Sequence, residues 1–187
     1  MQQFTKKEIK LSMLRLLESM PLDNIKVKTI IDDCGISRNT FYYYYCDIYD
    51  VLKDIFDGSV SAIVEKSPEE FSWEYVFESI ANSVLVNKNI ITNVFSSKYI
   101  EQITVYIDNV LGEFIAKIIK ERYVKYCNEE LNADITIIST FYKHAVTGTF
   151  YEWIHKGIKT DPKEFIKKLG KIFPNNLEES LKVLYQN

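Results

Sequence analysis

Residues 27–46 read VKTIIDDCGISRNTFYYYYC, and this stretch decides the fold. Apolar residues recur at helical spacing over 27–34, which predicts a short amphipathic helix. Gly35 follows as the residue that tolerates a positive φ after a helix end. Ser37 is a favoured N-cap for a second helix over 37–45. Two short helices joined at a glycine are the arrangement of a helix-turn-helix.

The second of these helices ends in four consecutive tyrosines. At 100° per residue, Phe41 and Tyr45 share one inward face, so Tyr42, Tyr43 and Tyr44 are left outward or sideways. An aromatic run more often belongs to a core, but three adjacent side chains cannot all pack inward. Outward phenol groups can donate hydrogen bonds to phosphates, which favours DNA binding.

The first turn of the 37–45 helix carries the polar residues that such a role requires. In a helix-turn-helix, the N-terminal residues of the second helix reach base edges in the major groove. Arg38 can pair with phosphate or guanine, and Asn39 can pair with adenine.

Helical periodicity also dominates outside this stretch. The segment Thr5-Lys6-Lys7-Glu8 resembles a capping box at the start of a first helix, and no strand pattern occurs. We therefore predict an all-α protein with an N-terminal three-helix helix-turn-helix domain (1–46), a long connecting helix (47–66) and an α-helical ligand-binding and dimerisation domain (67–187). Helices of this last domain are expected near 72–86, 89–97, 98–126, 133–156, 162–172 and 176–186, after a break at 67–70.

Composition limits the mode of DNA binding. The 187 residues are 47% hydrophobic, as in a globular protein, and the formal net charge is −3. Residues 1–46 hold seven Lys/Arg against five Asp/Glu, net +2, whereas 47–187 hold sixteen against twenty-one, net −5. Because the basic excess is small, binding must use placed contacts rather than a large basic field.

The sequence argues against an enzyme, a metal site and a membrane protein. Cys34, Cys46 and Cys127 have no metal-ligand spacing and suit reduced thiols in a cytoplasm. His144 and His155 are eleven residues apart on one expected helix, about 16 Å of rise, too far to share a metal. No phosphate-binding or nucleophile motif occurs, and no apolar run approaches membrane-spanning length. We expect a cytoplasmic protein without a cofactor.

At this point a family resemblance becomes specific. The stretch from Thr5 to Leu52 resembles the DNA-binding domain of the TetR family of bacterial transcriptional regulators, through its first helix, its Cys34-Gly35-Ile36-Ser37 turn and its aromatic run. The wording TFYYYYCDIYDVL resembles a branch that includes the activator of dihydroxyacetone kinase operons. Gly148-x-x-x-Glu152-Trp153-Ile154-x-x-Gly157, followed by Asp161-Pro162, resembles the C-terminal domain of that branch.

The resemblance implies a regulator that binds a palindromic DNA operator as a homodimer, by family habit a repressor that an effector releases. An activator that works with a co-regulator protein is the alternative within DNA binding. Carried onto this chain, the resemblance implies DNA contacts from Lys26, Lys28, Ser37, Arg38, Asn39, Tyr42, Tyr43 and Tyr44, with Thr40 in support.

Three residues depart from the family pattern. Lys26 stands where a threonine usually caps the second helix, and Tyr44 stands where histidine is frequent. Ile48 stands where a lysine commonly begins the fourth helix, so one expected phosphate contact is absent. This leaves open an interaction module with weak DNA binding.

The region after residue 67 is expected to supply a dimer surface and an effector site. The helices at 133–156 and 162–172 are the candidates for the dimer surface, which we place at Ala145, Gly148, Thr149 and Trp153; the same residues could instead face their own core. A small-molecule effector could lie among aromatic side chains, although aromatics at helical spacing are more often plain core. The candidate pocket residues are Trp73, Phe77, Phe95, Tyr99, Tyr106, Phe114 and Tyr142.

Overall fold

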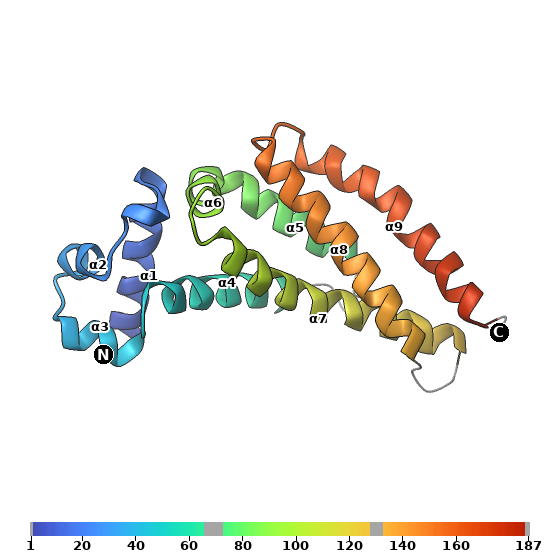
Figure 1. Cartoon of the computed structure of the whole chain (residues 1–187), viewed down its shortest axis with the longest axis horizontal. Helices are drawn as coiled ribbons and strands as arrows, with labels where there is room; N and C mark the ends of the chain where they lie inside the picture. The colour runs from blue at the N-terminus through green and yellow to red at the C-terminus, as the bar shows by residue number, and fades with distance from the viewer. Residues whose placement is uncertain (1, 66–72, 128–132, 186–187) are drawn as a thin grey trace. The chain divides into compact units, whose positions relative to one another are not determined.

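The computed structural model describes residues 2–65, 73–127 and 133–185, and within these ranges every regular element is a helix (Figure 1). The predicted all-α class is confirmed. The chain divides into two compact units, Met1–Lys98 and Tyr99–Asn187. In order, the elements are α1 (Gln2–Ser19), η1 (Leu22–Asn24), α2 (Val27–Cys34), α3 (Arg38–Tyr44), α4 (Ile48–Glu65), α5 (Trp73–Val86), α6 (Lys88–Phe95), α7 (Ile100–Cys127), α8 (Ala133–His155) and α9 (Pro162–Tyr185).

Helix α1 begins earlier than the capping pattern indicated. It starts at Gln2, so Thr5 lies inside the helix rather than at its cap. The residues before Thr5 include neither glycine nor proline, and nothing in them stops the helix from extending. At its other end, α1 stops at Ser19, two residues before Pro21, which cannot continue a helix.

The turn between α2 and α3 forms as predicted. Gly35 adopts the left-handed conformation, with φ 65° and ψ 32°, and its N–H donates to the carbonyl of Ile31. Ser37 is the N-cap of α3, where its Oγ accepts from the backbone N–H of Thr40 at 3.0 Å. At the start of α2, the Lys26 side chain cannot accept such a bond, and α2 begins without a side-chain cap from that residue.

Unit Met1–Lys98 is built around α1. Helix α6 packs against α1, and the Asn93 side-chain amide donates to the backbone carbonyl of Leu17 at 2.8 Å. Asn89 bonds to Glu18 at the same distance. Each fully buried Ile, Leu or Phe in this core contributes about 1.5–3 kcal/mol. The side chains with no exposed surface include Ile9, Met13, Leu17, Leu22, Ile30, Phe41 and Val51.

The predicted domain boundaries, after residues 46 and 66, do not coincide with the boundary between the two compact units, after Lys98. Helix α4 begins at Ile48, where Asp47 accepts bonds from the backbone N–H groups of Tyr49 and Asp50 at 2.7 and 3.0 Å. The predicted break at 67–70 lies outside the described residues. Because α5 and α6 belong to the same compact unit as the helix-turn-helix, the assignment of 67–187 to regulation stays a prediction.

Unit Tyr99–Asn187 contains α7, α8 and α9, which run alongside one another (Figure 1). Trp153 of α8 stacks on Phe165 of α9 with ring centroids 5.0 Å apart, and its Nε1 donates to the carbonyl of Thr160 at 3.2 Å. Further along, the Tyr142 hydroxyl and Ser180 Oγ are 3.2 Å apart. The unit is therefore held at both ends of α9.

Helix α9 corrects the expectation of two C-terminal helices at 162–172 and 176–186. It is continuous from Pro162 to Tyr185, although proline occupies position 174. A proline removes one intrahelical hydrogen bond and usually ends or kinks a helix. Here Ile166 and Leu177, one on each side of that position, are both buried. Packing against the unit on both sides outweighs the local cost.

The turn glycine offers a direct test of the helix-turn-helix geometry. We predict that Gly35→Ala lowers the free energy of unfolding by about 1–2 kcal/mol, because an L-residue with a Cβ is disfavoured at positive φ. A Cβ at this position would meet no atom within 4 Å, so backbone conformation alone sets the cost. Chemical denaturation followed by circular dichroism measures it. Gly35→Asn is the matched control and should lose less, since asparagine tolerates this conformation; equal losses would contradict the prediction.

Candidate nucleic-acid interface

Helix α3 places its aromatic residues on two faces, as its periodicity predicted. Phe41 is fully buried and Tyr45, just after the helix, is 4% exposed, whereas Tyr42 and Tyr43 are 50% and 69% exposed. The Tyr43 ring meets the Tyr44 ring edge to face at 4.9 Å, and Tyr44 is half-buried. The outward face of α3 is therefore an aromatic surface with polar tips.

The N-terminal turn of α3 presents polar groups beside these tyrosines. Arg38 and Asn39 are both exposed. The Ser37 hydroxyl is engaged by the backbone N–H of Thr40 and lies 2.8 Å from the Thr40 hydroxyl. Ser37 and Thr40 thus fix the first turn of α3, while Arg38 and Asn39 extend into solvent, where they could reach phosphate or base edges.

Two lysines add positive charge at the N-terminal end of α2. Lys26 is the N-cap residue and Lys28 lies in the first turn, and both side chains are exposed. The positive end of the α2 helix dipole also favours anions there. The start of α4, in contrast, offers neither an exposed lysine nor free backbone N–H groups at Tyr49 and Asp50. Ile48 is half-buried, and Asp47 occupies the N–H groups of the first turn.

A charged network behind α3 was not predicted from the sequence. The Tyr45 hydroxyl donates to Oδ2 of Asp54 at 2.6 Å. Nζ of Lys6 and Nζ of Lys10 each lie 3.3 Å from the same oxygen. Burial raises the pKa of the Tyr45 hydroxyl, and the neighbouring Asp54 carboxylate raises it further. Asp54 lies on α4, nine residues after Tyr45. Because the two residues do not belong to one helix, helical periodicity could not predict their contact.

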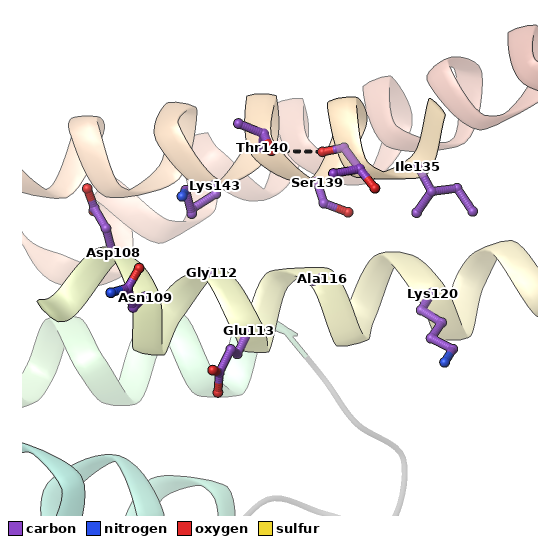
Figure 2. A pocket seen from close by; sticks show the side chains of 11 residues that line it. Asp108, Asn109, Gly112, Glu113, Ala116, Lys120, Ile135, Ser139, Thr140 and Lys143 are labelled. Atoms are coloured by element: carbon purple, nitrogen blue, oxygen red, sulfur yellow. Dashed lines mark hydrogen bonds between the residues drawn. The ribbon is translucent and has the colours of Figure 1, made fainter. Parts of the chain in front are cut away.

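The second unit contains an open groove of about 590 Å³ between α7 and α8, and most of the residues that line it are polar or charged. Figure 2 shows Gly112 and Ala116 along α7, with Lys143 and Ser139 on the facing side of α8. A Cβ on Gly112 would lie 2.6 Å from Cδ of Lys143, so glycine makes room for this lysine. The groove is lined by Asp108, Asn109, Gly112, Glu113, Ala116, Lys120, Ile135, Thr136, Ser139, Thr140 and Lys143.

Among the aromatic residues that were expected around an effector and whose side chains the structure describes, none lines this groove. Phe77, Phe95 and Tyr142 are buried, and the Trp73 side chain lies outside the described residues. The remaining three, Tyr99, Tyr106 and Phe114, are half-buried in the second unit. The hydroxyl of Tyr151, on α8, donates a hydrogen bond at 2.7 Å to Asp108, one of the residues that line the groove.

Helix α8 carries an exposed apolar stripe, formed by residues that are three or four positions apart and therefore share one face of the helix. Ile137 and Phe141 are 69% and 67% exposed, and Ala145 and Gly148 continue the stripe. A Cβ on Gly148 would meet nothing within 4 Å. Of the other residues expected at a dimer surface, Thr149 is half-buried, and Trp153 packs inside its own chain. The spacing of Ile137, four residues before Phe141, was the available signal in the sequence.

Among the described helices, none combines the length and apolar character needed to cross a membrane.

Comparison with known proteins agrees with the all-helical fold. Residues 71–175, more than half of the chain, match the TetR-type family described as "Transcriptional regulator C-terminal region". The chain belongs to the TetR family of transcriptional regulators. No curated protein matches the chain.

Solved structures of this family share the fold over most of their length. The dihydroxyacetone kinase operon activator DhaS superposes with a TM-score of 0.71 at 17% identity, covering 96% of this chain and 97% of that one. A TetR transcriptional regulator from Streptococcus agalactiae gives 0.65 at 18% identity, covering 89% and 92%. A putative TetR-family regulator from Syntrophomonas wolfei gives 0.65 at 20% identity, covering 100% and 97%.

The exposed tyrosines provide a test of the interface. We predict that Tyr43→Ala and Tyr42→Ala each weaken binding to cognate DNA about tenfold, the effect of a lost hydrogen bond to a charged group. Fluorescence anisotropy with labelled duplex measures this, and the midpoint of thermal unfolding should stay unchanged because both rings are exposed.

Two further variants define the cause. Tyr43→Phe keeps the ring and removes only the hydroxyl, so it should reproduce most of the loss if the contact is to phosphate. Phe41→Ala, at a fully buried site, should cost about 3–5 kcal/mol of stability. A drop in stability for Tyr43→Ala as large as that for Phe41→Ala would contradict an outward, DNA-facing role.

Proposed function

We propose that this TetR-family regulator binds a palindromic operator as a homodimer, represses transcription there and is released by an effector. The observation that carries DNA reading is the outward face of α3, where two exposed tyrosines adjoin exposed Arg38 and Asn39. Exposed aromatic surface is unfavourable without a partner. Phenol and guanidinium groups are suited to phosphate and base edges. Lys26 and Lys28 add phosphate contacts in this proposal, and residues 1–46 form the reading domain.

A mobility shift with DNA from upstream of the protein's own gene tests the reading role. We expect a protein-dependent shift that weakens steeply with added salt, because each phosphate contact releases counterions. An unrelated duplex of the same length and composition is the control and should shift only at higher protein concentration. If neither duplex shifts even at low salt, the chain does not act by binding DNA, and the interaction-module alternative takes its place.

The exposed stripe on α8 supports dimerisation. One helix-turn-helix reads only a few base pairs, so two half-sites about one helical turn apart require two copies. Ile137, Phe141, Ala145 and Gly148 form a face with large residues at one end and small residues at the other. Small residues let another helix approach closely, and an apolar face of this kind is typical of a protein interface. Thr149 flanks this face, and Trp153 supports it from within the chain.

The dimer prediction is that wild-type protein has about twice the mass of one 21.9 kDa chain in light scattering. Phe141→Glu should shift the mass to that of one chain, because the charge would be buried on association. Val105→Glu is the matched control, since Val105 on α7 is 56% exposed and outside the stripe. A Phe141→Glu protein that stays dimeric would place the interface elsewhere.

A second candidate is activation with a co-regulator protein. It is favoured by the fold match to a protein named as an operon activator and by the resemblance of residues 40–52 to the same branch. The two candidates differ in sign. The measurement is transcription in vitro from the promoter DNA that this protein shifts in the mobility assay. Transcription falls on addition of the protein if it is a repressor. It rises only when the protein and its partner are added together if it is an activator.

A further inference from the structure

The charged network behind α3 joins three helices at one atom. Oδ2 of Asp54, on α4, accepts a hydrogen bond from the Tyr45 hydroxyl at 2.6 Å. The same oxygen forms ion pairs with the ammonium groups of Lys6 and Lys10, both on α1, at 3.3 Å each. Nζ of Lys6 lies 5.6 Å from the centre of the Tyr45 ring, within cation–π range. All four residues belong to unit Met1–Lys98.

The network lies where the orientation of α3 is decided. Tyr45 is the C-cap of α3, with φ −142° and ψ 138°, so the chain turns extended at this residue. The exposed side chains Tyr42 and Tyr43, which are proposed to contact DNA, lie three and two residues before it. The Tyr45 ring is buried, but a ring can slide or rotate within an apolar pocket. A short hydrogen bond to a carboxylate fixes the orientation of the ring, whereas burial alone fixes only that the ring is inside the protein.

The Asp54 carboxylate is held in its charged form. Burial alone raises the pKa of this group, but the hydrogen bonds from Tyr45, Lys10 and Lys6 together lower the pKa below its ordinary value. The same charge keeps the two lysines against the protein. With Asp54 neutral, Lys6 and Lys10 would be two uncompensated cations beside the end of α3, where they would attract any DNA regardless of sequence.

We propose that Asp54 is a positioning residue for sequence-specific DNA reading. It fixes the C-terminal end of α3 through Tyr45, and it holds Lys6 and Lys10 in ion pairs, so that operator DNA is bound in preference to unrelated DNA. This inference rests on the proposed DNA-reading function and adds to it a residue of α4 that is not among the proposed DNA contacts.

The test compares two affinities for each variant. A duplex selected from a random library by the wild-type protein serves as the cognate DNA, and a shuffled duplex of the same composition serves as unrelated DNA. For Asp54→Asn we expect cognate binding to fall about tenfold, the effect of losing a hydrogen bond to a charged group. Binding to the shuffled duplex should stay equal or rise, so the ratio of the two affinities falls at least about tenfold.

Two variants accompany Asp54→Asn. Tyr45→Phe keeps the buried ring and removes only the hydroxyl, so it isolates the bond that orients α3 and carries the test if Asp54→Asn does not fold. Asp32→Asn is the matched charge control, because it removes one carboxylate from an exposed site on α2. It should strengthen binding to both duplexes alike and leave their ratio unchanged.

The outcomes separate the inference from the function it rests on. A residue with only a structural role would lower the thermal midpoint and leave the affinity ratio intact. An unchanged ratio in both Asp54→Asn and Tyr45→Phe therefore overturns the positioning role while DNA reading stands. A wild-type protein that selects no sequence from the library overturns both.

Discussion

The proposed DNA-reading surface lies on a helix that is too short to be stable by itself. Helix α3 has seven residues, and a helix of that length is not stable alone in water because nucleation is costly. Its geometry is imposed from three sides. Ser37 caps the N-terminal end, Phe41 fills the core, and Tyr45 is bonded to Asp54 at the C-terminal end. These attachments use the two ends and one face, so the opposite face, which carries Tyr42 and Tyr43, stays exposed.

Helix α3 and helix α8 each leave large aromatic or aliphatic side chains exposed, and the chemistry of these side chains differs. On α3 the exposed rings are Tyr42 and Tyr43, which carry a hydroxyl at the outer end. On α8 the exposed residues Ile137 and Phe141 have no polar atom in the side chain. Hydroxyl-tipped rings suit a partner that accepts hydrogen bonds, such as phosphate, whereas purely apolar side chains suit a protein surface. In the proposed function, the first surface therefore binds DNA and the other binds a second copy of the chain.

Local pattern predicted the helices well and their ends less well. Periodicity identified each helical region because the signal repeats along the segment, and the αL glycine and serine cap marked the turn at residues 35–37 unambiguously. The two errors both concern places where a residue type favours a boundary. Thr5 is a good cap and position 174 is a proline, yet α1 and α9 run through them. At α9, the buried contacts of Ile166 and Leu177 decide the outcome, and such contacts are not visible in a local window.

By itself, the sequence determined the helix-turn-helix and the two faces of α3, because both follow from glycine conformation, capping chemistry and a rotation of 100° per residue. The tertiary structure alone decided that Asp54 meets Tyr45 and Lys6. It likewise decided which side of α8 stays exposed, and that a groove opens between α7 and α8. Each of these depends on how helices distant in sequence pack against one another. A helical period records which residues share a face, but it carries no information about which other helix that face will meet.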